Sequence, residues 1–273
     1  MILGDARPIG LFDSGVGGLT VVREVMKVMP GERIIYFGDT ARVPYGTKSS
    51  RVVQGFALQD ARLLMQYDVK LIVVACHTAS AVARDLLGKT LPLPVLGVIE
   101  PGVRAALRAT RNGRIGVIGT RGTISSGTYR RLIAAADPEI RAYGRPCPLF
   151  VPLAEEGWVD GSVTREVART YLAPLVRRKV DTLILGCTHY PLLKEIIRSV
   201  MGPDIRLIDS AEETAGAILR TLRDRGIENL SGSRPEHRFM VSDIPHQFRR
   251  VGERFLGCRL ESLSRIDLDS VVP

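Results

Sequence analysis

The chain has 273 residues, of which 45% are hydrophobic and 25% charged, as is typical of a globular protein with one large or two ordinary domains. No run approaches the ~18 apolar residues of a transmembrane helix, and residues 1–7 do not resemble a signal peptide, so we expect a cytoplasmic protein. The net charge of +9 comes from scattered basic residues, which makes nucleic-acid binding an unlikely role.

The first predicted strand, residues 8–13, ends in Asp13. The glycine-rich loop that follows lacks the third glycine of a dinucleotide fingerprint and the Gly-Lys-Ser/Thr of a P-loop, so phosphate binding is not indicated. We expect a tight turn that presents Asp13 and Ser14 at the end of the strand. After a second strand, a loop that contains Tyr45 and Gly46 combines turn formers with polar donors and is a candidate binding loop.

Two cysteines occupy equivalent places. An apolar run over residues 71–75 predicts a buried strand that ends at Cys76, and a helix follows it. The arrangement recurs where residues 181–186 lead into Cys187. Ligands of open α/β sheets bind at the carboxyl ends of the strands, and backbone N–H groups at a helix start lower the pKa of a thiol. The pattern therefore suggests one site with two opposed thiols.

A weak internal repeat supports this interpretation. Residues 10–12 resemble residues 116–118, and a strand-end cysteine follows after 66 positions in the first case and 71 in the second. The repeat predicts two similar three-layer α/β/α domains with mostly parallel sheets, related by a pseudo-twofold axis, with the active site in the cleft between them. We expect the first domain over residues 1–98 and 209–273, where the C-terminal segment returns to it, and the second over residues 99–208.

Two thiols that face one cleft suit proton transfer at carbon. A thiolate can remove a proton from one face of a carbon while a thiol delivers another to the opposite face, which inverts the stereocentre. Asp13 and His189 could hold or position the cysteine protons, and Glu155, after an apolar extended run, could reach the cleft. Hydroxyl and backbone groups could bind the carboxylates of a substrate and stabilise its negative charge. These candidates are Ser14, Tyr45, Gly46, Thr78, Thr120 and Thr188.

Four segments closely resemble the aspartate/glutamate racemase family, in order and over nearly the whole chain: residues 13–18 (DSGVGG), 39–46 (DTARVPYG), 75–80 (ACHTAS) and 186–191 (GCTHYP). The resemblance implies a cofactor-independent, metal-free, two-base interconversion of L- and D-glutamate that supplies D-glutamate for peptidoglycan. It implies that Cys76 takes the proton from D-glutamate and Cys187 from L-glutamate, assisted by Asp13 and His189 respectively, with Glu155 beside His189. The implied substrate contacts are Asp13, Ser14, Tyr45, Gly46, His77, Thr78, Thr188 and His189.

One residue departs from the family pattern, because His77 stands where the family usually has asparagine. Both side chains offer one donor and one acceptor when neutral, but imidazole is bulkier and can be protonated. The replacement is therefore either a tolerated exchange or a change in substrate affinity, pH dependence or directional balance.

Several alternatives stay open. A relative in the same family could act on aspartate or another amino acid, and a non-catalytic binding or regulatory protein could keep the fold. A redox protein with a Cys76–Cys187 disulfide is disfavoured because no Cys-x-x-Cys motif is present, and the strand ends offer no lysine for pyridoxal phosphate. We also expect a homodimer, and the resemblance allows an interaction with DNA gyrase.

Overall fold

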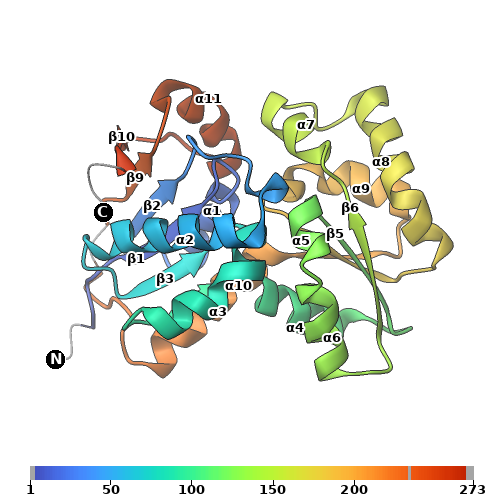
Figure 1. Ribbon diagram of the computed structural model, residues 1–273, viewed down its shortest axis with the longest axis horizontal. Helices are drawn as coiled ribbons and strands as arrows, with labels where there is room; N and C mark the ends of the chain where they lie inside the picture. The colour runs from blue at the N-terminus through green and yellow to red at the C-terminus, as the bar shows by residue number, and fades with distance from the viewer. Residues whose placement is uncertain (1–3, 233–234, 269–273) are drawn as a thin grey trace.

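The computed structural model of the protein describes residues 4–232 and 235–268, and its strands form two parallel sheets. Figure 1 shows the sheets in two lobes that lie side by side. The larger sheet has the order β10-β9-β2-β1-β3-β4, and the smaller one has the order β6-β5-β7-β8. The strands of the larger sheet are β1 (Ile9–Asp13), β2 (Ile34–Gly38), β3 (Leu71–Val74), β4 (Val95–Gly97), β9 (Arg238–Val241) and β10 (Leu263–Arg265). Those of the smaller sheet are β5 (Arg114–Gly119), β6 (Arg141–Pro146), β7 (Thr182–Gly186) and β8 (Arg206–Asp209).

Helices cover both faces of the larger sheet and form the first lobe with it. Because side chains alternate along a strand, Leu11 packs among α1, α10 and α11 on one face, while Phe12 packs among α2 and α3 on the other. The helices of this lobe are α1 (Leu19–Val28), the short 3₁₀ helix η1 (Tyr45–Thr47), α2 (Ser50–Met65), α3 (His77–Thr90), α10 (Ser210–Asp224) and α11 (Pro245–Leu256).

The smaller sheet is covered in the same way in the second lobe. Val117 packs with α4 and α6, and Ile118 packs with α8 and α9 on the opposite face. The helices of this lobe are α4 (Ile99–Ala109), α5 (Arg121–Ser125), α6 (Thr128–Ala136), α7 (Phe150–Glu156), α8 (Gly161–Arg177), η2 (Tyr190–Leu193) and α9 (Lys194–Met201).

The two lobes share one strand order, since β2-β1-β3-β4 in the first corresponds to β6-β5-β7-β8 in the second. Cys76 follows β3, which pairs with β1, and Cys187 follows β7, which pairs with β5. The prediction of two similar parallel α/β units with helices on both faces is therefore confirmed. None of the helices within the described ranges combines the length and apolar character needed to cross a membrane.

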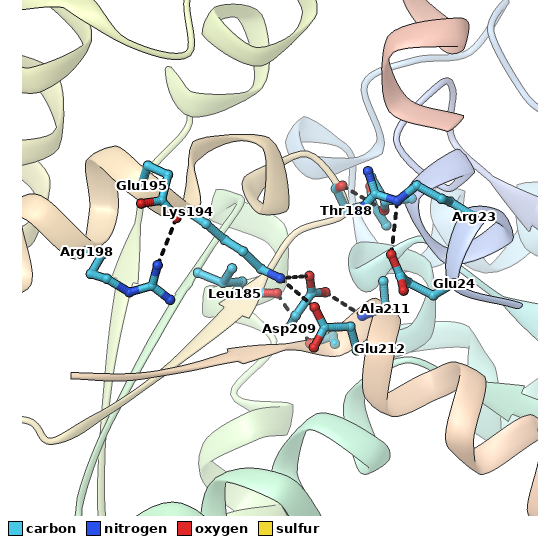
Figure 2. Close-up of polar contacts among 12 residues, drawn as sticks. Arg23, Glu24, Leu185, Thr188, Lys194, Glu195, Arg198, Asp209, Ala211 and Glu212 are labelled. Carbon is cyan, nitrogen blue, oxygen red and sulfur yellow. Dashed lines mark hydrogen bonds and ion pairs between the residues drawn. The ribbon is translucent and has the colours of Figure 1, made fainter. Parts of the chain in front are cut away.

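The chain passes between the lobes twice, from β4 into α4 and from β8 into α10, which packs against α1. At the second passage Asp209 caps α10 by accepting a hydrogen bond from the Ala211 N–H at 2.9 Å. The Lys194 ammonium lies 2.6 Å from Asp209 and 2.7 Å from Glu212, so the start of α9 is tied to this passage (Figure 2). We propose that the domain boundaries lie at these two passages, near residues 98 and 209; residues 1–3, 233–234 and 269–273 of the predicted ranges lie outside the described residues.

One local prediction was wrong. The apolar run before Glu155 is not extended but forms the helix α7. Pro152 is tolerated there because it occupies the first turn, where its missing N–H would have no partner within the helix. The glycine-rich loop after β1 does turn, as predicted, but it contains no left-handed residue, so its glycines are not required for a positive φ. They allow close approach instead, since a Cβ at Gly18 would lie 2.6 Å from that of Asp13.

Candidate active site

Cys76 and Cys187 line the same cavity, which has a volume of about 180 Å³ and lies between the two lobes. Each cysteine follows the carboxyl end of a central parallel strand, and each is only 6% exposed. The predicted residues that the first lobe contributes to the lining are Ser14, Tyr45, Gly46, His77 and Thr78. Those from the second lobe are Thr120, Glu155, Thr188 and His189.

A histidine and a carboxylate accompany Cys187. The Nδ1 atom of His189 lies 3.7 Å from the Cys187 sulfur, and its Nε2 atom lies 2.8 Å from Oε1 of Glu155. Burial alone would lower the pKa of His189, but the hydrogen bonds to Cys187 and Glu155 outweigh it and raise the pKa to about 10. The imidazole is therefore protonated at neutral pH and presents a cation to the sulfur.

A hydroxyl group and a buried acid accompany Cys76. The thiol donates to Oγ of Ser14 at 3.7 Å. Burial and the nearby carboxyl group of Asp13 raise the pKa of Cys76 to about 12, although the Ala79 N–H and the Ser14 hydroxyl favour the thiolate. The expected lowering by the start of α3 is thus overcome by desolvation.

Asp13 lies behind the cavity wall and is 1% exposed, although the sequence predicted it at the surface of the site. Its Oδ2 atom accepts hydrogen bonds from the Gly15 N–H at 3.2 Å and the Gly18 N–H at 3.0 Å. Burial raises the pKa of Asp13, and the charge of His189 and these N–H groups oppose the rise. Asp13 can act on Cys76 from behind, but it does not face the cavity.

His77 lines the cavity with a buried ring whose two nitrogen atoms have no hydrogen-bond partner among the described residues. Burial, with a smaller effect of the His189 charge, lowers the pKa of His77 to about 3. The ring is therefore neutral at physiological pH and offers one donor and one acceptor to a bound molecule.

The binding loop with Tyr45 and Gly46 is held from behind. The Tyr45 hydroxyl points away from the cavity, contacts Asp39 and donates to Asp60 at 2.9 Å. Arg42 pairs with Asp39 at 2.6 Å and with Asp60 at 2.8 Å. Burial and the charge of Asp39 raise the pKa of Asp60 well above its ordinary value, so this one cation opposes the charge of the pair. The phenol therefore anchors the loop, and Tyr45 and Gly46 can meet a ligand through their backbone.

Three hydroxyl groups join the lobes next to Gly46, since a Cβ at Gly46 would lie 2.7 Å from that of Thr120. Thr78 Oγ1 lies 2.9 Å from Thr120 Oγ1 and 3.1 Å from Thr123 Oγ1, and the latter two atoms are 3.0 Å apart. Thr123 was missed by the sequence analysis. Its place one turn after the strand-end Thr120, whose hydroxyl caps α5 by accepting from the Thr123 N–H, could have indicated it.

The sequence analysis also missed much of the cavity wall. The loop before Tyr45 contributes apolar contacts, and the segment around α7 adds two prolines. Arg121, at the start of α5, supplies a cation. The additional lining residues are Gly15, Val43, Pro44, Thr47, Arg121, Pro148, Val151 and Pro152.

The geometry supports proton transfer from two sides of one small molecule. Residues with hydroxyl groups and the cationic Arg121 line the cavity together with the two cysteines, and they suit an anionic substrate. Among residues 4–232 and 235–268, no three His, Cys, Asp or Glu side chains gather in a way that could hold a metal ion.

Known proteins resemble this chain closely. The profile of the Asp/Glu/Hydantoin racemase family matches residues 19–218. The glutamate racemase of Geobacter metallireducens is 53% identical, over 97% of this chain and 98% of the relative. The crystal structure of glutamate racemase from Francisella tularensis in complex with D-glutamate has 44% identity and a TM-score of 0.92, and covers 97% of this chain and 99% of that one. The crystal structure of glutamate racemase from Thermus thermophilus in complex with beta-chloro-D-alanine has 45% identity and a TM-score of 0.89. The match covers 97% of this chain and 98% of that one. The chain belongs to the Asp/Glu/hydantoin racemase family.

Proposed function

We propose that the protein is a glutamate racemase that interconverts L- and D-glutamate with two cysteine bases and no cofactor. The observation that carries the proposal is that Cys76 and Cys187 line one cavity from opposite lobes. The relatives with about half of their residues identical bear the same activity in their names, and one related enzyme was crystallised with D-glutamate. Production of D-glutamate for peptidoglycan would be its cellular role.

In the proposed reaction the Cys187 thiolate removes the Cα proton of L-glutamate, and the Cys76 thiol protonates the opposite face. The reverse reaction starts with the Cys76 thiolate and D-glutamate. His189, protonated and held by Glu155, faces the Cys187 sulfur, and Ser14 and Asp13 support Cys76. After one turnover the two cysteines have exchanged protonation states, so a proton must return through solvent or side chains before the next.

The substrate would be held through its two carboxylates and its ammonium group. Neutral His77 can donate to a carboxylate and accept from the ammonium, because neither ring nitrogen has a hydrogen-bond partner in the part of the chain that the structure describes. The hydroxyls of Thr78, Thr120 and Thr188, with the backbone at Gly46, offer further donors. Buried donors near Cα would stabilise the negative charge that develops when the proton leaves.

Exchange of the Cα hydrogen tests this proposal. Purified protein is incubated in D₂O buffer without added cofactor, with glutamate or aspartate, and Cα deuteration and the enantiomeric ratio are followed. We expect exchange and racemisation with glutamate. Exchange with aspartate alone would indicate a different member of the family, and no exchange with either substrate would indicate a non-catalytic protein. The homodimer and the contact with DNA gyrase stay predictions, which sedimentation and pull-down with purified gyrase would test.

A further inference from the structure

The start of α1 in the first lobe contacts the loop that carries Cys187 in the second lobe. Thr20, the second residue of α1, is 0% exposed. Its hydroxyl donates across the cleft to the backbone carbonyl of Thr188 at 3.0 Å and shares this hydrogen with the Gly17 carbonyl at 2.9 Å. Figure 2 shows Thr188 near the part of α1 that bears Arg23 and Glu24. The bond reaches the residue between Cys187 and His189.

Gly17 makes the close approach of the lobes possible at the same place. A Cβ atom at this position would lie 2.2 Å from Oγ1 of Thr188 and 2.5 Å from Nδ1 of His189. Both distances are shorter than any non-bonded contact, so the backbone of the first lobe lies directly against the imidazole that faces Cys187. Any opening of this contact would move His189 relative to the rest of the site.

The Cys76 loop has a corresponding support from the opposite lobe. Thr78, two residues after Cys76, bonds through its hydroxyl to Thr120 and Thr123 of the second lobe. Thr188, one residue after Cys187, is held by Thr20 of the first lobe. Hydroxyl groups of the other lobe thus fix each cysteine loop. On the Cys76 side one of these residues, Thr120, also lines the cavity, whereas Thr20 on the Cys187 side does not.

We infer that Thr20 is a positioning residue for the Cys187–His189 pair, an inference that rests on the proposed racemase activity. Thr20 does not line the cavity, so it acts through the main chain of Thr188. Its hydrogen bond sets the distance and angle between the imidazole and the sulfur when the lobes are together. Proton transfer is sensitive to displacements well below 1 Å, so loss of the bond slows the step at Cys187 more than substrate binding.

The test compares Thr20→Val with Thr20→Ser. Valine has nearly the shape of threonine but cannot donate, and it leaves the Thr188 carbonyl without this partner. We expect Thr20→Val to lower kcat about tenfold with KM changed less than about twofold, and Thr20→Ser to retain most of the activity.

Isotope effects identify the side that is affected. For a racemase the values of kcat/KM in the two directions are equal, because the equilibrium constant is one. A slower step at Cys187 therefore appears as a larger primary deuterium isotope effect on kcat/KM with Cα-deuterated L-glutamate, and a smaller one with D-glutamate. A general loss of folded enzyme would change neither.

A matched control is Thr214→Val. Thr214 is also 0% exposed, lies on α10 next to α1, and donates to the Ser210 carbonyl within its own helix at 2.6 Å. The Thr214→Val variant should retain wild-type kinetics and isotope effects. If Thr20→Val does not fold, Thr20→Ala also removes the donor and is measured in its place.

Three results would overturn the role of Thr20: unchanged kcat in the variant without the hydroxyl, isotope effects that match those of the wild type in both directions, or an equal loss in Thr214→Val. A wild-type enzyme that does not racemise glutamate would instead contradict the proposed function. The two failures are therefore distinguishable in the same set of assays.

Discussion

Cys76 and Cys187 have the same place in their sheets and the same exposure, but their polar neighbours differ. Cys187 faces an imidazole that Glu155 holds from its other side, whereas Cys76 faces the Ser14 hydroxyl with Asp13 behind it. The pKa of His189 is raised to about 10, and that of Cys76 to about 12. The repeated strand order thus positions two thiols equivalently, while loop residues give them different polar partners. In the free enzyme we expect Cys76 to be a thiol next to Ser14 and the buried Asp13, and Cys187 to lie next to the cationic His189.

Removal of either sulfur should have the largest effect, because both are needed in every turnover. We expect Cys76→Ala and Cys187→Ala each to lower racemisation about 10⁴-fold, at the upper end of what a general acid or base contributes. Circular dichroism assays with both enantiomers measure this. Cys258→Ala is the control, since Cys258 is exposed and does not line the cavity. Substantial racemisation by either cavity variant would rule out two-base chemistry.

Changing one helper on each side should reveal the difference between the sides. His189→Asn and Asp13→Asn should each lower kcat about 10²–10³-fold, since each disturbs one proton transfer. The primary isotope effect should rise with Cα-deuterated L-glutamate for His189→Asn, and with D-glutamate for Asp13→Asn. Identical isotope patterns in the two variants would show that neither residue serves one cysteine in particular.

Loss of the Glu155 charge should have a moderate effect that depends on pH. In Glu155→Gln the carboxylate no longer raises the pKa of His189, so the imidazolium is lost at a lower pH than about 10. The alkaline limb of the kcat profile for L-glutamate should therefore move to lower pH, with about a tenfold loss at pH 9. Glu156→Gln, on the next residue of α7 and outside the cavity, is the control. An unmoved alkaline limb in Glu155→Gln would mean that His189 does not set it.

Replacement of His77 should have the smallest effect. Because burial lowers the pKa of His77 to about 3, the ring does not titrate between pH 6 and 9. His77→Asn should keep the pH profile in both directions and change KM by about threefold or less, since asparagine also offers one donor and one acceptor. An ionisation between pH 6 and 9 that the wild-type profile shows and the His77→Asn profile lacks would contradict this.

The sequence predicted the positions of the two cysteines better than it predicted the residues that hold the site in place. Runs of β-branched residues that end at Cys76 and Cys187 show where two buried strands stop, and parallel strands place such ends at one edge. The pairing of His189 with Glu155 was expected only from the family resemblance. It joins residues 34 positions apart and depends on the α7 helix, where the sequence suggested an extended run. Local patterns do not encode such contacts.

Burial and side-chain direction were equally hidden. Asp13 was expected at an open strand end, but the adjacent glycine loop folds over it and supplies two N–H donors. Tyr45 was expected to contact substrate, but its hydroxyl turns to buried carboxylates of the first lobe. No sequence pattern indicates Thr20, because its hydrogen-bond partner Thr188 lies in the other lobe. Each depends on tertiary packing that one sequence does not display.

Isotope labelling in the first turnovers tests the two-cysteine mechanism most directly. L-glutamate with ordinary hydrogen at Cα is incubated with the enzyme in D₂O. Before equilibrium is approached, the residual L-glutamate and the new D-glutamate are separated, and their deuterium content is measured by mass spectrometry. Two bases on opposite faces predict D-glutamate that is fully deuterated at Cα, while the remaining L-glutamate largely keeps its original hydrogen at Cα. D-glutamate that retains the original hydrogen would show that a single base carries the proton between faces, and would contradict the account.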